Sequence, residues 1–311
     1  MSSATGLSVM DVAVLDALDH VGATPDRYVK NKRVLDEAFQ CHNIPPRPGY
    51  QVLCDLSRSW VVHLPLVDFH GNAGSPDFGP ASPLYTESRL SPLGAAALAA
   101  ERGEIGPLPI GLINGNTYVD GPKPPFDPTR ILAGVRSAAA GGSDEMIAAT
   151  VGAPSFPGGC RVQYDHERLV TGIRTRLDVC ANVAAAGPGL IRITSIPSDI
   201  NSGTIVLALE HRAEHPPPER PEGWPALPPR LPIRNINDQS ADGRRLLEVT
   251  LEPEADDDAV IAEIEGIWGV HTEIDVTLGQ PLARILRDWV DFGSRDDLDD
   301  RLAIIANAIR G

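Results

Sequence analysis

Three side chains in the first third of the chain have types that could do chemistry. Tyr85 lies in the stretch SPLYTESRL, and His42 and His70 precede it. A phenol is a weak nucleophile at its free pKa of about 10, so a catalytic tyrosine needs a base and cationic or metal assistance. A nearby histidine is a candidate base. The simpler alternatives also stand: a packed Tyr85 ring with a bonded hydroxyl, a surface His42 and a turn residue at His70.

The cysteines show no metal or disulfide pattern. Four are present without CxxC spacing or clustered histidines, so we expect ordinary reduced thiols: Cys41, Cys54, Cys160 and Cys180. The sequence contains no P-loop and no ATPase signature. The aspartates at 256–258 are explained more simply by a helix N-terminus than by a metal site. We therefore expect this chain to bind no cofactor of its own.

The charge balance is acidic. A net charge of −15, with 42 acidic and 27 basic residues, produces a field that repels polyphosphate. Only the positions of the arginines can show whether a local basic groove exists. The N-terminus lacks a basic start followed by an apolar stretch, and no run approaches the roughly 20 apolar residues of a membrane span. We expect a cytoplasmic protein of two domains, with no membrane contact.

The first half is mainly helical by pattern. Apolar spacing predicts a helix over residues 8–21, and a cap at Thr24 followed by proline predicts a second helix to about residue 39. Residues 61–80 favour a short strand followed by a turn-rich loop. Helical composition resumes directly after Tyr85, so the tyrosine is expected at a loop-to-helix junction.

The second half changes to an alternating pattern. Four stretches predict half-buried strands, namely residues 190–196, 204–212, 245–253 and 272–278. A proline-rich segment over 216–232 predicts an exposed loop. The fold class is therefore α+β.

A last helix is predicted near the end of the chain. Ser294 is a candidate cap. Apolar residues then follow in steps of 4, 3 and 4, which is typical of a coiled-coil seam: Leu298, Leu302, Ile305 and Ile309.

Several short motifs occur in a telling order. GNAGS, LYTESRL, GLINGN, SFPGG and LRDWVDFGSRDDLDDRL follow one another, and SIPSDINS, NDQSADGRR and WVDF fall between or within them. In this order they resemble the A subunits of the type IIA topoisomerases, the DNA gyrase and topoisomerase IV family. The resemblance runs from about Gly6 to the C-terminus, with several deletions.

The resemblance implies a fold and a reaction. It implies a winged-helix breakage-reunion domain over 1–158, an α/β tower domain over 159–292, and a truncated coiled-coil helix over 293–311. Tyr85 would attack a DNA phosphate to form a transient phosphotyrosine, and His42 matches a histidine of the family. Mg²⁺ would be held by a separate toprim/ATPase subunit. The implied partners are that subunit, DNA and a second copy of the chain.

The sequence departs from the family where cations should face DNA. Leu84 occupies the position at which the family has an arginine before the tyrosine. Lys123 occupies the position at which the family has an isoleucine that wedges into DNA. Each neutralised phosphate contributes about −0.9 to the log-log salt slope, so losing five or six cations weakens binding by several orders of magnitude. Losing the cation beside the nucleophile can cost on the order of 10³ in rate. The other departures are Ser8, Asp11, Val12, Ala13, Ile44 and Asp55.

Three functions remain open at this point. The first is DNA breakage and rejoining through Tyr85 with a partner subunit, in weak or lost form. The second is a non-catalytic relative that binds a partner subunit, an inhibitor or another ligand. The third is a small-molecule enzyme that uses a cleft around Tyr85, His42 and His70.

Overall fold

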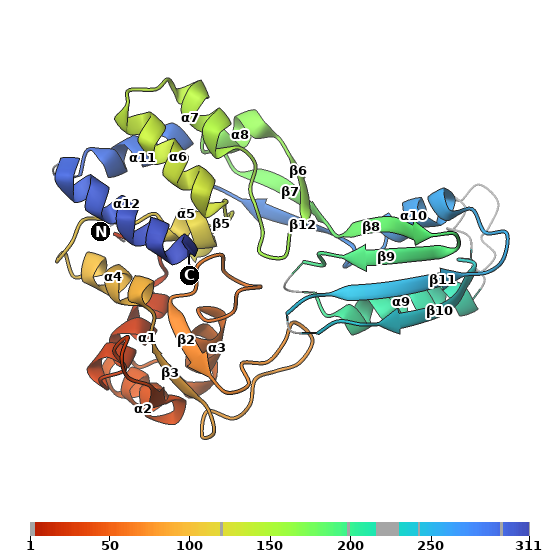
Figure 1. The fold of residues 1–311 in the computed structure, drawn as a ribbon, viewed down its shortest axis with the longest axis horizontal. Coiled ribbons are helices and arrows are strands. Elements are labelled where there is room, and N and C mark those ends of the chain that lie inside the picture. The colour runs from red at the N-terminus through yellow and green to blue at the C-terminus, as the bar shows by residue number, and fades with distance from the viewer. Residues whose placement is uncertain are drawn as a thin grey trace.

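The chain forms a head and a projecting arm. The computed structural model describes residues 4–118, 121–197, 200–215, 230–241, 243–292 and 295–310. Figure 1 shows the head, which contains both ends of the chain, and the elongated arm that extends from it. Each part has its own hydrophobic core, because residues up to Val179 and from Val276 onward pack together while residues from Ala181 to Val270 form a second cluster. The predicted domain limits of 1–158, 159–292 and 293–311 stay predictions.

The head begins with three helices and a small sheet. The helices are α1 (Val9–His20), α2 (Asn31–His42) and α3 (Pro46–Asp55). Strands β1 (Val29–Lys30), β2 (Val67–His70) and β3 (Glu87–Leu90) form an antiparallel sheet in the order β1-β3-β2. The predicted first helix is confirmed. The predicted start of the second helix at Thr24 is wrong, because Val29 and Lys30 pair with β3 and α2 begins only after them.

The element after Tyr85 is a strand. The predicted loop-to-helix junction is wrong, since Glu87–Leu90 alternate in burial and pair with both β1 and β2. The Ala-rich helix α4 (Pro92–Glu101) starts later, with Ser91 as its cap. A Cβ at Gly94 would lie 2.0 Å from the Leu66 carbonyl oxygen, so only glycine lets α4 approach the segment before β2.

The rest of the head surrounds these elements. It contains α5 (Ile110–Asn114), the hairpin of β4 (Asn116–Tyr118) and β5 (Gly121–Lys123), α6 (Pro128–Ala139), α7 (Asp144–Val151) and α8 (His166–Val170). A second antiparallel sheet has the order β12-β7-β6, from β6 (Arg161–Tyr164), β7 (Thr175–Cys180) and β12 (His271–Val276). The paired strands β7 and β12 carry the chain out to the arm and back.

The arm is one antiparallel sheet with two helices. Its strands are β8 (Asn182–Gly187), β9 (Leu190–Thr194), β10 (Ile233–Asp238) and β11 (Leu246–Leu251), in the order β10-β11-β9-β8. Its helices are α9 (Ser202–Glu214) and α10 (Asp257–Glu265). The α+β class is thereby confirmed. Most of the predicted proline-rich loop, residues 216–229, lies outside the described residues.

One strand prediction in the arm is wrong. Residues 204–212 belong to α9, where Ile205 and Leu209 are fully buried one helical turn apart. A short apolar run fits a helix face as well as a buried strand, and here the helix covers the sheet.

The last two helices of the chain belong to the head. Helix α11 (Leu282–Val290) leads to α12 (Arg295–Arg310), and the predicted cap Ser294 lies outside the described residues. Leu298, Leu302 and Ile305 are buried in the head core, where α12 packs on α4 and α6. Most of the predicted coiled-coil seam is therefore covered by this chain itself. No described helix has the length and apolar character needed to cross a bilayer.

Candidate functional site

Tyr85 lies in a turn that is attached to the start of α2. The Tyr85 N–H donates to the Ser82 carbonyl over 2.9 Å. The first turn of α2 has no side-chain cap, and its backbone N–H groups are satisfied by the tyrosine segment instead. Asn31 N–H donates to the Thr86 carbonyl at 3.1 Å, and Lys32 N–H donates to the Pro83 carbonyl at 3.1 Å. The helix and the turn therefore fix each other.

A buried polar network lies under this turn. Thr86 is 1% exposed, and its hydroxyl accepts from Asn31 Nδ2 at 2.9 Å. The Tyr50 hydroxyl lies 3.0 Å from the Thr86 hydroxyl and donates to the Ala81 carbonyl. Burial raises the pKa of Tyr50, so this phenol stays protonated as a donor. The bonds among Thr86, Asn31 and Tyr50 hold the turn in place, while Asn31 Oδ1 is buried without a hydrogen-bond partner among the described residues.

Tyr85 itself points outward from this support. Its side chain is 77% exposed, and its hydroxyl has no hydrogen-bond partner among the described residues. The interpretation of a packed ring with a bonded hydroxyl is therefore wrong. Leu84, at the place of the family's arginine, is also exposed at 55%. The turn thus offers a free phenol next to an apolar side chain.

The structure separates the two histidines. His42 is the last residue of α2, ten residues after Lys32, which is roughly 15 Å along the helix from the tyrosine turn. Its Nε2 lies 3.0 Å from Asp16 Oδ2, in an ion pair that Arg102 also joins. His70 is closer, because it pairs with Glu87 in the β2–β3 ladder and packs edge-on against Tyr28.

Most cations near the turn are matched by carboxylates. Lys30 pairs with Glu87 at 3.0 Å, and Lys32 pairs with Asp36. Arg89 pairs with Asp68 at 2.9 Å and lies over the Tyr28 ring. Arg33, next to Lys32, is exposed and has no ion-pair partner among the described residues. The described surface at the turn is therefore electrostatically mixed, and no continuous arginine-lined path to Tyr85 is formed by these residues.

The positions of the missing cations have structural roles. Ser8 and Asp11 form a reciprocal capping box at the start of α1. Ala13 and Ile44 are buried in the head core. Asp55 pairs with the buried Arg58 at 2.9 Å. These residues stabilise the head where the resemblance implies DNA contacts.

Two further positions depart from the family pattern. Val12 is half-buried against the head core. Lys123 ends the β4–β5 hairpin opposite Asn116 and is half-buried. The neighbouring Pro122 carbonyl accepts from the Thr277 N–H at 3.0 Å, which ties this hairpin to the strand that returns from the arm.

A cavity between head and arm was not anticipated from the sequence. Its volume is about 720 Å³, and its lining includes Trp60 from the head and Arg192, Arg244 and Arg245 from the arm. A Cβ at Gly243, where φ is +76°, would lie 2.7 Å from the Trp60 ring, so the arm loop touches the head there. Two other cavities have volumes of about 490 and 760 Å³. Tyr85, His42 and His70 line none of these three.

Curated proteins similar to this chain have consistent names. The A subunit of DNA gyrase from Synechocystis is 36% identical over 96 residues, which is 30% of this chain and 11% of that protein. The Mycobacterium bovis protein of the same name is 37% identical over 91 residues, or 28% of this chain and 11% of that protein. The A subunit of DNA topoisomerase 4 from Neisseria gonorrhoeae is 24% identical over 335 residues, covering 90% of this chain and 43% of that protein.

These similarities name the same family as the order of the sequence motifs. No family model matches the chain. The chain spans less than half the length of the curated relatives that it matches. Because a weak match covers nearly the whole chain and stronger matches cover part of it, the chain is related to the A subunits of type IIA topoisomerases.

Proposed function

We propose that this chain is a topoisomerase A-subunit-like protein that binds DNA and cleaves it through Tyr85, at a rate well below that of a relative with an intact set of cations. The exposed Tyr85 hydroxyl on a rigid turn is the observation that carries this proposal. A tyrosine kept only for packing would have its ring covered and its hydroxyl paired. The relatedness to gyrase and topoisomerase 4 A subunits supports DNA strand cleavage as the reaction of this phenol.

The fold supports the proposal in outline. Helices α1 to α3 with the β1-β3-β2 sheet fit a winged-helix domain, and the arm fits a tower. The cavity between them is lined by three arginines, of which Arg192 pairs with Glu248 at 2.8 Å and Arg245 donates to the Pro197 carbonyl at 2.6 Å, so a phosphate backbone bound there would compete with these partners. Two copies of the chain would be needed to cut both strands of a duplex.

The proposed step conserves atoms and charge. The Tyr85 oxygen attacks phosphorus, and the bond from phosphorus to a deoxyribose oxygen breaks. The phenol gives up its proton to a base, and the leaving oxygen takes up a proton. Mg²⁺ on a toprim/ATPase partner would stabilise the charge on the phosphate oxygens. With Leu84 beside the phenol, this chain adds no cation of its own there, so the expected rate is low.

A second candidate function follows from the same loop. Phe78, Leu84 and Tyr85 are exposed at 78%, 55% and 77%, and they belong to one short segment. Exposed apolar groups of this kind mark interaction sites. A non-catalytic module that docks on a topoisomerase subunit through this segment is therefore the alternative.

A covalent-adduct assay tests the first proposal. The full chain is incubated with nicked, end-labelled DNA, Mg²⁺ or Mn²⁺ and a toprim/ATPase subunit from the same cell, and protein-linked DNA is measured after denaturation. We expect a weak adduct that Tyr85→Phe abolishes and that Tyr164→Phe, a matched loss of another phenol, leaves unchanged.

DNA binding is measured in parallel by titration at several salt concentrations. No adduct together with no salt-sensitive binding would overturn the catalytic proposal. Capture of a topoisomerase subunit that is lost in Phe78→Asp would then support the interaction module.

A further inference from the structure

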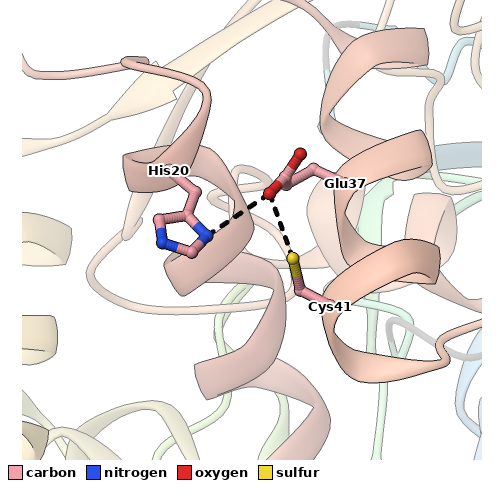
Figure 2. A group of neighbouring side chains, drawn as sticks. All are labelled: His20, Glu37 and Cys41. Carbon is pink, nitrogen blue, oxygen red and sulfur yellow. Dashed lines mark hydrogen bonds and ion pairs between the residues drawn. The ribbon is translucent and has the colours of Figure 1, made fainter.

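Three metal-binding side chains meet on the face where α1 and α2 pack together. Figure 2 shows His20 on α1 and Glu37 and Cys41 on α2, with the nitrogen and the sulfur directed at one carboxylate oxygen. His20 Nδ1 lies 3.3 Å from Glu37 Oε1, and the Cys41 thiol donates to the same oxygen at 3.1 Å. This cluster has no part in the tyrosine site.

The spacing of the three ligand atoms is close to that found around a bound metal ion. Glu37 and Cys41 are four residues apart and therefore share one helix face. All three ligand atoms lie within 4.8 Å of one another. Metal–ligand bonds of 2.0–2.3 Å in a tetrahedral site imply ligand spacings of about 3.5 Å. Side-chain rotations that move the ligand atoms by about 1 Å would bring their spacing from the 4.8 Å limit to that of a tetrahedral site. His20 and Cys41 are exposed, so their side chains have room to rotate.

The surrounding charge favours a cation. The hydrogen bond to Glu37 raises the pKa of the Cys41 thiol, and the charge of Asp16 acts in the same direction. Arg102 is already bound to Asp16 and Asp19 at 2.7 and 2.8 Å, while Arg33, one helical turn before Glu37 on α2, is exposed. A divalent ion would relieve the repulsion between a Cys41 thiolate and the Glu37 carboxylate, releasing the thiol proton on binding.

We propose that His20, Glu37 and Cys41 form a binding site for Zn²⁺ or a similar transition-metal ion. One sulfur, one imidazole nitrogen and one carboxylate oxygen match the preferences of Zn²⁺, whereas Mg²⁺ and Ca²⁺ require oxygen ligands. Three protein ligands leave the fourth position for water or an exogenous ligand. The ion would cross-link α1 to the end of α2 that lies away from Tyr85, so the site is distinct from any Mg²⁺ held by a partner subunit.

Cobalt binding tests the site directly. The metal-free full chain is titrated with Co²⁺, and the near-ultraviolet charge-transfer absorption of a cobalt–thiolate bond is recorded. We expect one ion per chain, displacement of Co²⁺ by Zn²⁺, and a rise in melting temperature on binding. Cys41→Ser should abolish the charge-transfer band, and His20→Ala and Glu37→Gln should each weaken binding at least tenfold.

The control is Cys180→Ser, which removes a partly buried thiol outside the cluster and should leave the titration unchanged. Because the cluster lies at the surface, we expect all variants to keep the melting temperature of the metal-free protein. Absence of the band, or a band that persists in Cys41→Ser, would overturn the proposal.

Discussion

The two ends of helix α2 are built in opposite ways. At its start, Asn31 is fully buried and its side-chain N–H group joins a network with Thr86 and Tyr50. At its end, Cys41 and His42 are at the surface and make hydrogen bonds and ion pairs with side chains only. One helix therefore holds a rigid support at one end and an adaptable polar cluster at the other.

This difference shows what each end can do. Movement of the groups under Tyr85 would break buried hydrogen bonds and leave more polar atoms unpaired, so the turn is held in one place for the proposed attack on a phosphate. Ligands at the other end can rotate toward an ion because water replaces the bonds that they give up. The proposed nucleophile and the proposed metal site thus depend on opposite degrees of order.

Thiol labelling should show the largest contrast between these regions. Cys54 lies behind the buried network, where burial raises the pKa of its thiol to about 11, whereas Cys41 is exposed. The Glu37 hydrogen bond also raises the pKa of Cys41, but this thiol is accessible. At pH 8 a thiol with a pKa of about 11 is only about 10⁻³ ionised and Cys54 is also shielded by burial, so we expect it to react at least ~100-fold more slowly than Cys41. Peptide mass spectrometry after timed alkylation measures both rates. Comparable rates in the folded protein would contradict the described burial.

Removing the hydroxyl at Thr86 should have the next largest effect. Thr86→Val leaves Asn31 with an unpaired buried donor, which costs roughly 2–3 kcal/mol of unfolding free energy. Urea unfolding followed by circular dichroism measures the loss, and the yield of the Tyr85 adduct should fall with it. Thr150→Val, at a half-buried helix position where the hydroxyl donates to the Met146 carbonyl at the surface, is the matched control and should change stability little. Equal stability of the two variants would mean that the network does not support the turn.

The sequence identified Tyr85 as a candidate residue but misassigned elements on both sides of it. Tyr85 stands out by its motif, and the amphipathic spacing of α1 was sufficient to place that helix. The strand after Tyr85 was missed because Glu87–Leu90 pair with strands far away in sequence. Residues 204–212 were misassigned because a short apolar run does not distinguish a strand from a buried helix.

The cluster of His20, Glu37 and Cys41 could not be predicted from the sequence for a different reason. Glu37 and Cys41 have a suggestive spacing, but His20 comes from another helix and becomes a neighbour only when α1 packs on α2. Likewise, the arginines of the arm meet Trp60 only through the tertiary fold.

Placing a cation beside Tyr85, at the ordered start of α2, should increase the affinity for DNA. Leu84→Arg places a positive charge on an exposed side chain next to the phenol. One added phosphate contact steepens the log-log salt slope by about 0.9, which is about a tenfold gain in DNA affinity at 0.1 M salt. Fluorescence anisotropy with a labelled duplex measures both quantities, and adduct yield should rise as well. Leu84→Gln is the uncharged control, and an equal gain in that variant would exclude the electrostatic cause.

The smallest expected effect concerns acid stability at the polar end of α2. Burial opposes ionisation of Asp16, but hydrogen bonds and charges from Arg102 and His42 outweigh it and lower the pKa of this carboxyl below its usual 3.8. The stabilisation is therefore complete above that value and is lost as the pH falls through the lower folded-state pKa. Asp16→Asn should cost under about 1 kcal/mol near neutral pH, as solvent-screened pairs do. In urea unfolding between pH 5 and pH 2.5, the stabilities of wild type and variant should converge. A constant gap across that range would show that Asp16 acts through packing, and the polar end of α2 would then resemble its rigid start.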